Sequence, residues 1–223
     1  MDISSSEIDF LKLIQRSASS CIFHTRWRDK ECILKVYHHI EASHADPKSR
    51  EVDTFTCESR AYTRLKAYGL CGRGSVPDFY GVVQDINPME RLPHLKDFLR
   101  DRVYPKGVLL EFIPNLREID LSTFSQDRVY KLRQILTEIH EAGVYHGDPY
   151  PRNMVVQEGS DRVLWIDFDR AQTRNSITPR QQQLLDEEDE LVDYFVDALA
   201  ADFKEGKIHR TWECYYDTIY QEP

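Results

Sequence analysis

Two polar motifs in the second half of the chain constrain the fold most strongly. The first is HGDPYPRN at residues 146–153, which runs directly into an apolar stretch, and the second is WIDFD at residues 165–169, which ends another. The polar residues 157–162 separate the two apolar stretches. Two short apolar runs joined by a polar turn are typical of a β-hairpin. The sequence therefore predicts a hairpin with a polar motif beside each strand.

This hairpin would gather three oxygen-bearing side chains at one end of a small sheet. Asp148 and Asn153 precede its first strand, and Asp167 follows its second. Converging carboxylate and amide oxygens suit Mg²⁺ and a phosphate-rich ligand. One of the carboxylates could also accept a proton from an attacking hydroxyl.

Composition and charge narrow the class of protein. The net charge of -9 argues against a general nucleic-acid binder, although a local site for ATP is compatible with it. No apolar run approaches the roughly 18 residues of a membrane span, and the N-terminus lacks the pattern of a signal peptide. The five scattered cysteines have no CxxC spacing and are interpreted as reduced thiols. We expect an intracellular protein, in the cytoplasm.

The first half of the chain reads as a small antiparallel sheet with one helix. A helix is predicted over residues 51–67, after a polar loop, and residues 85–106 are expected to be an irregular or partly helical excursion. Strands are predicted at residues 10–14, 21–27, 32–37, 77–84 and 107–113.

Glu58 falls on the apolar stripe of the predicted helix, where a carboxylate is costly unless it is paired. Lys35, in an otherwise apolar strand, is the natural partner. The alternative is that both side chains extend to water from the edge of a core.

The second half is predicted to be mainly helical. One helix begins near Ser125 and ends at Gly143, a second begins at Thr178, and a last one covers residues 211–220. The acidic run 186–190 in the second helix is interpreted as a solvated face. The run is expected to be balanced by the basic residues Arg170, Arg174 and Arg180; the alternative is that these arginines meet an acidic acceptor.

The order of these elements and motifs resembles the protein-kinase-like fold. That fold combines a strand lysine and a helix glutamate with an HxDxxxxN loop and a DF turn. The resemblance implies an α+β bilobal protein: a small antiparallel β-sheet N-lobe with one helix, and a reduced, mainly helical C-lobe. The lobes are expected at residues 1–111 and 112–223, with a hinge at about 111–116.

The resemblance also implies a nucleotide site. Lys35 would hold the phosphates of ATP and would itself be held by Glu58. Backbone groups of Glu111 and Ile113 in the hinge would bind the adenine.

The same resemblance assigns the catalytic loop. Asn153 and Asp167 would ligate Mg²⁺, and Asp148 would act as the general base. His146 would have a structural role.

Several positions depart from regulated protein kinases. The phosphate loop, residues 16–20, contains no glycine. Gly147 resembles aminoglycoside and choline phosphotransferases and lipopolysaccharide-core sugar kinases, while Asp169 replaces the glycine of DFG. The short segment 170–177 leaves no room for a long activation loop. In its compactness the chain resembles RIO-type kinases and small, divergent kinase-like proteins of fungal genomes.

The function expected from this pattern is ATP- and Mg²⁺-dependent transfer of a phosphoryl group to a hydroxyl. The acceptor is either a Ser or Thr of a protein or a small molecule. A second hypothesis is a pseudokinase that serves as a binding or scaffold module, which the missing glycines favour. A third is an unrelated α+β domain whose two motifs are turns.

Overall fold

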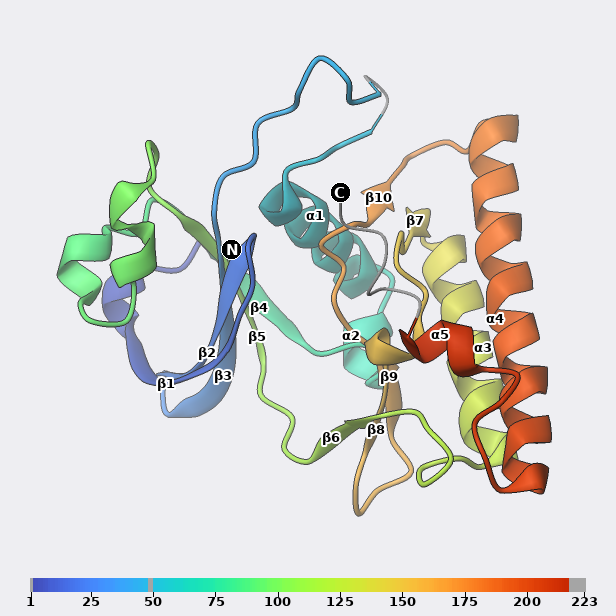
Figure 1. Cartoon of the computed structure of the whole chain (residues 1–223). Helices are drawn as coiled ribbons and strands as arrows, with labels where there is room; N and C mark the ends of the chain where they lie inside the picture. The colour runs from blue at the N-terminus through green and yellow to red at the C-terminus, as the bar shows by residue number, and fades with distance from the viewer. Residues whose placement is uncertain (1, 48–49, 217–223) are drawn as a thin grey trace.

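The N-terminal half of the chain forms a five-stranded antiparallel sheet. The structure, a computed structural model, describes residues 2–47 and 50–216. The strands lie in the order β1-β2-β3-β5-β4 (Figure 1). All five predicted strands are present, with ends shifted by a few residues. They are β1 (Ile8–Arg16), β2 (Ser20–Trp27), β3 (Lys30–Tyr37), β4 (Phe79–Val83) and β5 (Lys106–Glu111).

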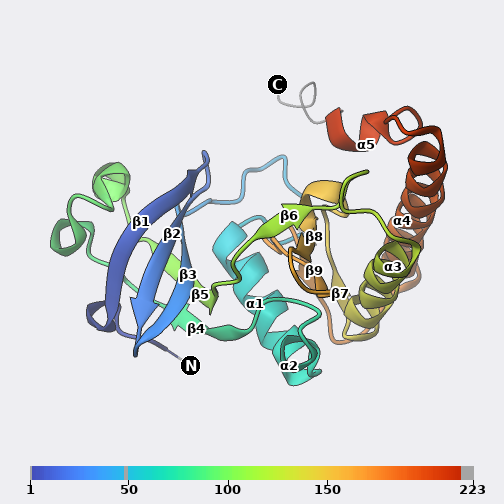
Figure 2. The same ribbon diagram turned by 90° about the horizontal axis from the view of Figure 1, so that it is seen from below.

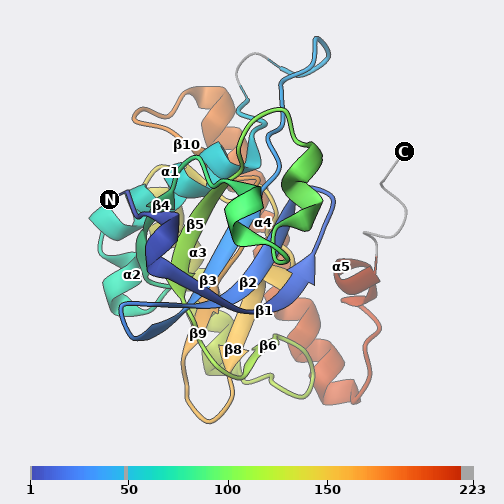
Figure 3. The ribbon, with the colours of Figure 1, turned by 90° about the vertical axis from the view of Figure 1, so that its left-hand side faces the viewer.

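The outer face of this sheet is covered by the excursion between β4 and β5. The excursion contains the 3₁₀ turns η2 (Pro88–Arg91) and η3 (Lys96–Arg100), and it lies across the strands in Figure 3. Leu95 and Phe98 are buried there against alternate residues of the strands. Side chains along a strand alternate between the two faces of the sheet. The strand residues that do not pack against Leu95 and Phe98 therefore point to the opposite face. The excursion thus supplies an apolar core on the side away from the rest of the molecule.

The inner face packs against α1 (Thr54–Ala67), which lies between the sheet and the second half of the chain (Figure 2). The helix begins three residues later than predicted because Asp53 is its N-cap, accepting a hydrogen bond from Thr56 N at 3.0 Å. A further helical turn, α2 (Leu70–Arg73), was not predicted. It follows Gly69, which adopts a left-handed φ of +83°.

The second half is built on two long helices, α3 (Gln126–Glu141) and α4 (Pro179–Glu205). Both predicted helix starts are confirmed, with Ser125 and Thr178 as N-caps. The predicted hairpin is also present, as β8 (Met154–Gln157) paired with β9 (Val163–Trp165). The remaining short elements are η1 (Ser5–Glu7), β6 (Leu116–Glu118), β7 (Val144–Tyr145), η4 (Pro151–Asn153) and β10 (Gln172–Thr173).

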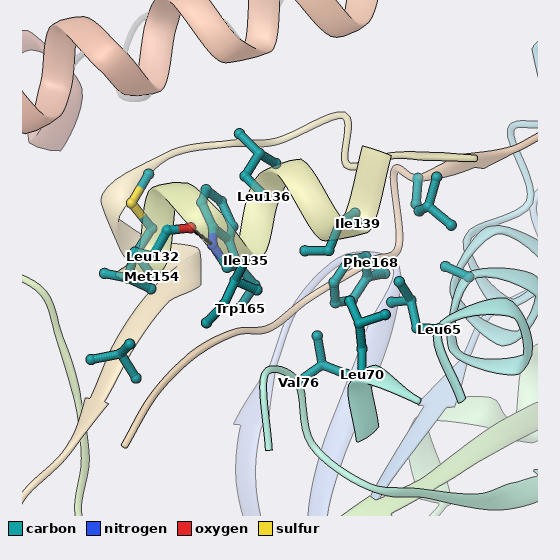
Figure 4. Close-up of a cluster of buried hydrophobic side chains, with 14 of the residues drawn as sticks. Leu65, Leu70, Val76, Leu132, Ile135, Leu136, Ile139, Met154, Trp165 and Phe168 are labelled. Atoms are coloured by element: carbon teal, nitrogen blue, oxygen red, sulfur yellow. Dashed lines mark hydrogen bonds between the residues drawn. The ribbon is translucent and has the colours of Figure 1, made fainter. Parts of the chain in front are cut away.

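A shared apolar core holds the hairpin against both helical regions (Figure 4). Trp165 is fully buried, and its Nε1 donates a hydrogen bond to Leu132 O of α3 at 2.9 Å. Phe168 is also buried, between Leu65 of α1 and Ile139 of α3. The WIDFD motif therefore carries two of the side chains that join the halves of the molecule.

The chain turns sharply after α4 and ends its described part in α5 (Trp212–Tyr216). This helix begins one residue later than predicted. Residues 217–220 of the predicted helix lie outside the described residues. Asp202 is buried and organises the turn by accepting hydrogen bonds from the backbone N–H groups of His209, Arg210 and Thr211. No helix in the described ranges combines the length and apolarity that crossing a bilayer requires.

The Asp202 turn predicts a pH-dependent stability. Despite burial, the three N–H donors hold the pKa of Asp202 below its ordinary value of 3.8. A carboxylate with a depressed pKa in the folded state stabilises above its unfolded pKa, and this contribution is lost as pH falls below about 4. We expect Asp202→Asn to lower the free energy of unfolding at pH 7 by about 2 kcal/mol. Urea unfolding of the wild type and of Asp202→Asn at pH 7 and below pH 4 measures the difference between their free energies of unfolding. A difference that did not shrink in acid would contradict the prediction.

Candidate active site

Lys35 is the buried centre of a cluster of charges. Its Nζ lies 2.9 Å from a carboxylate oxygen of Glu58 and 3.1 Å from one of Asp169, and it also donates to Asp167. β3 supplies the lysine, α1 the glutamate, and the segment after β9 both aspartates. Lys35 and Glu58 are only 5% and 1% exposed. The structure therefore brings the predicted Lys35–Glu58 pair together inside the protein and excludes the solvated alternative.

The cluster has more negative than positive groups. One oxygen from each of Glu58, Asp167 and Asp169 lies within 4.8 Å of the others. Burial raises the pKa of Glu58 to about 7 and the pKa of Asp169 above its ordinary value, although Lys35 opposes both shifts. Burial acts on Asp167 as well, but Lys35 outweighs it and holds its pKa below the ordinary value. The Lys35 ammonium lies among these oxygens and offsets part of their mutual repulsion, and a hard divalent cation held by the aspartates would offset more of it.

Two further groups fix Glu58 in place. The hydroxyl of Tyr37, a fully buried residue of β3, donates to its carboxylate, and Phe168 N lies 3.4 Å from its other oxygen. The role of Tyr37 was not predicted, although its position two residues after Lys35 places both on one face of β3. The carboxylate is thus oriented from three directions.

The backbone around Asp167 and Gly147 is unusual. Asp167 has a φ of +63°, a left-handed conformation that is costly for a residue other than glycine and that occurs often at functional sites. Gly147 has a φ of +82°, and a Cβ there would lie 2.4 Å from the carbonyl oxygen of Arg170. The loop of residues 146–153 and the segment after Asp169 therefore approach each other too closely for any side chain at position 147.

Asp148 lies in a small polar network at the start of the hairpin. The Arg152 guanidinium donates to it through two nitrogens, Nε at 3.1 Å and Nη2, and Asn153 Nδ2 donates to it at 2.7 Å. The same guanidinium lies over the ring of Tyr150, 4.7 Å from its centroid. Ile166 N donates to Asn153 O at 3.0 Å, which ties the loop to the residue before Asp167. The structure therefore places all three predicted residues of the hairpin end near one another.

Glu188 is a functional candidate that the sequence analysis missed. Interpreting the whole run 186–190 as solvated was wrong, because Glu188 is buried. Its carboxylate accepts from His146 N at 3.0 Å and Gly147 N at 2.6 Å, and it lies 2.9 Å from His140 Nε2. A carboxylate on α4 thus holds the backbone directly before Asp148.

The helical register contains the signal that could have identified Glu188. Leu185 and Val192 are buried on α4, and Glu188 lies three residues after the first and four before the second. Residues at this spacing share a helix face. Nearby acids of the run contact side chains of α3, as in the 3.2 Å ion pair between Arg133 and Asp189.

His146 has the structural surroundings that were predicted for it. Its ring packs between Trp165 and Phe168, with centroids at 5.1 and 4.6 Å. Nε2 lies 3.2 Å from Ile166 O. Burial lowers the pKa of His146, which favours the neutral ring at pH 7.

The predicted adenine-binding residues follow β5. The side chain of Glu111 forms two hydrogen bonds of 2.9 Å with Arg162, and its N–H donates to Asp78 O at 2.8 Å. Ile113 is buried and, within the described residues, has no backbone hydrogen bond to another backbone group. Its role in binding adenine stays a prediction.

The glycine-free loop between β1 and β2 is closed by its own serines. Ser17 Oγ accepts from the N–H groups of Ser19 and Ser20 at 3.2 and 3.0 Å, and Ser17 N donates to Ser20 O at 2.8 Å. The 2.8 Å ion pair between Arg16 and Asp97 ties the loop to η3. Most of the N–H groups that could bind a phosphate in this loop are already satisfied internally.

Comparison with known families is consistent with this geometry. Residues 116–206 match the model of the lipopolysaccharide kinase (Kdo/WaaP) family. The fold is protein-kinase-like. The matched segment contains Asp148, Asn153, Asp167 and Glu188, whereas Lys35 lies outside it, in the five-stranded sheet. The match covers less than half of the chain, and a search of curated proteins found no match. It supports a kinase-like phosphotransferase that acts on a hydroxyl group.

Proposed function

We propose that the chain is an ATP- and Mg²⁺-dependent phosphotransferase that transfers the γ-phosphoryl group to a hydroxyl acceptor. The observation that carries this proposal is the buried cluster of one lysine and three carboxylates, beside a loop that holds Asp148. Phosphoryl transfer depends on positioning and charge neutralisation more than on covalent chemistry. In this proposal Lys35 and a cation held by the aspartates would neutralise the phosphate charge. Asp148, the candidate base, would position the acceptor hydroxyl.

Nucleotide binding would rearrange the bonds of Lys35. An ammonium group has three donors, and Lys35 already has three carboxylate partners. Phosphate oxygens must therefore replace at least one of them. Asp167 and Asn153 would hold Mg²⁺, which would supply neutralisation of phosphate and carboxylate charge. Lys35 would exchange its bond to Asp167 for one to the phosphates, while Glu58 would keep it oriented.

Asp148 would orient the acceptor hydroxyl and accept its proton. In the structure its carboxylate is bound by Arg152 and Asn153. Asn153 Nδ2 also donates to the backbone oxygen of Asp148 at 2.9 Å. Asn153 therefore binds both the side chain and the backbone of Asp148. Arg152 would release Asp148 when the acceptor enters and would then face the transferred phosphoryl group.

The short segment after Asp169 favours a small-molecule acceptor over a protein. In this segment β10 pairs directly with β7, and α4 begins at Pro179. A docked peptide would need an extended surface on this part of the chain, whereas a small hydroxyl compound needs contacts only around Asp148. A sugar or other polyol is the class that the match to lipopolysaccharide kinases also suggests.

A pseudokinase is the second candidate, and the serine-closed loop favours it. A loop whose N–H groups bond to Ser17 offers few donors to the nucleotide. If the chain has lost nucleotide binding, the Lys35 cluster would be a structural link between sheet and α1. Nucleotide binding therefore distinguishes the two candidates.

We expect ATP to raise the melting temperature of the protein only when Mg²⁺ is present. A ligand at one hundred times its Kd stabilises the folded state by about 2.7 kcal/mol, which corresponds to roughly 5–10 °C in a protein of this size. Thermal unfolding with ATP, with and without Mg²⁺, measures the effect.

Asp167→Asn should remove this Mg²⁺-dependent shift, and Asp161→Asn, at a fully exposed position, should preserve it. No shift at millimolar ATP and Mg²⁺ would refute the nucleotide site and favour the pseudokinase.

A further inference from the structure

A cavity of about 570 Å³ lies beside the catalytic loop, on the side of β7 and β10. Gly147 forms part of its wall, so only one peptide link separates it from Asp148. The other walls come from the loop before α1, from β10 and the residues after it, and from the first turns of α4. This volume is in the range of sites for small organic ligands.

The charged groups in its wall all have one sign. Arg50, Arg174 and Arg180 line the cavity, and none of its described lining residues is acidic. This is notable in a protein with a net charge of -9. A concave wall lined by charges of one sign focuses the electrostatic field and concentrates ions of the other sign. Guanidinium groups bind phosphate well because their fixed N–H geometry matches two oxygens at once.

Part of the wall is apolar. Ile177, Leu184 and Leu185 line the cavity together with Tyr145. Ile177 and Leu184 are 44% and 37% exposed, so apolar surface remains open to an occupant. A ligand that buries this surface while meeting the arginines must have an apolar body and an anionic end.

The start of α4 is not the source of the anion site. Thr178 and Gln181 form a reciprocal capping box, with Gln181 Oε1 accepting from Thr178 N at 3.0 Å and Thr178 Oγ1 accepting from Gln181 N at 3.4 Å. These N–H groups are already bonded. Arg174 also has a partner, with Nη2 donating to Gln172 Oε1 at 3.4 Å. The exposed side chains of Arg50 and Arg180 are therefore the main donors that a ligand would meet.

We propose that this cavity, which we call the arginine cavity, binds a phosphate monoester with an apolar or ring-shaped body, at a site distinct from that of the nucleotide. Such a ligand would contact both halves of the molecule, since Arg50 precedes α1 while Arg174 and Arg180 flank the start of α4. Glu51 and Gln172 already form one bridge there, with Glu51 N 2.9 Å from Gln172 Oε1. The ligand would reinforce that bridge and so the placement of α1 against the catalytic loop.

Phenyl phosphate is a suitable probe, with phenol as its uncharged counterpart. Binding to the full chain is measured by calorimetry for the wild type and for the double variant Arg50→Gln/Arg180→Gln, whose side chains are both exposed. The matched control is Arg26→Gln/Arg100→Gln, which removes two exposed arginines outside the cavity wall. We expect phenyl phosphate to bind the wild type and the control alike, the double variant to bind at least about tenfold more weakly, and phenol to bind far more weakly.

Methyl NMR shows which site the probe occupies. We expect the methyl signals of Ile177 and Leu184 to shift on titration, while Ile33, two residues from Lys35 on β3, does not. The proposal is overturned if phenyl phosphate does not bind, if both double variants weaken it equally, or if Ile33 shifts and Ile177 does not. The last result would place the probe in the nucleotide site, and it would leave the proposed phosphotransferase intact.

Discussion

Replacement of Asp148 by Asn is expected to abolish most of the phosphoryl transfer while the protein still binds Mg²⁺ and ATP. The amide keeps the shape of the side chain but cannot accept the proton of the acceptor hydroxyl. Positioned general bases contribute about 10²–10⁴-fold to rates, so kcat should fall by that factor. Release of phosphate or ADP with a panel of small hydroxyl acceptors measures kcat, and the Mg²⁺-dependent thermal shift reports nucleotide binding.

The matched control for this substitution is Asp120→Asn, in the turn before α3. Asp120 also accepts side-chain and backbone hydrogen bonds from nearby residues, including Ser122 N at 2.7 Å. Its side chain bonds to Ser122, Thr123 and Arg117 and has no described bond to either motif, so its replacement should leave kcat unchanged. A kcat that is the same in Asp148→Asn and the wild type would refute the role of Asp148 as the base.

Replacement of Glu188 by Ala is expected to destabilise the protein and to disorganise the catalytic loop. The change would leave the N–H groups of His146 and Gly147 without their acceptor and would remove one of the two carboxylate partners of His140. Loss of one partner from a buried hydrogen-bonded pair costs about 3–5 kcal/mol. Urea unfolding should show this loss, and kcat should fall even at temperatures where the variant remains folded.

Two further variants test whether the effect of Glu188→Ala depends on the position of the acid in α4 and on its charge. Glu187→Ala removes an exposed acid one residue away, whose contact is to Gln183 at 2.9 Å, and should change stability by no more than about 0.5 kcal/mol. Glu188→Gln keeps one acceptor oxygen and should recover part of kcat relative to Glu188→Ala. Equal effects of Glu187→Ala and Glu188→Ala on unfolding would show that Glu188 has no special role.

The elements that could be predicted from the sequence are those set by local patterns. The hairpin of β8 and β9 is formed by neighbouring stretches, and the starts of α3 and α4 are marked by Ser125 and Thr178. Such features depend on residues close in sequence, whose side chains carry the period of a strand or helix and the chemistry of a cap. The first turn of α1 was misplaced because residue 51 fits a helix locally, whereas Asp53 makes the cap.

The candidate site was predictable only in part, for the same reason. Lys35, Glu58, Asp148, Asn153 and Asp167 could be selected because each belongs to a motif or interrupts an apolar stripe. The charge run alone does not select Glu188, whose only signal is its helical register with Leu185 and Val192, and the strand pattern places Tyr37 beside Lys35 without showing that it binds Glu58. Composition shows that a run is acidic, but burial against α3 and the catalytic loop determines which acid is removed from water.

By itself, then, the sequence determined the kinds of elements, their order and the polar residues that phosphoryl transfer would need. Only the tertiary structure decided that Lys35 meets three carboxylates from residues far along the chain, that the excursion covers the sheet, and that the glycine-free loop bonds to itself. It also decided that three arginines line one cavity. These contacts join segments that are distant in sequence, and they depend on how helices and sheet pack together. No local pattern encodes that packing, because its free energy arises from burying all of these surfaces at once.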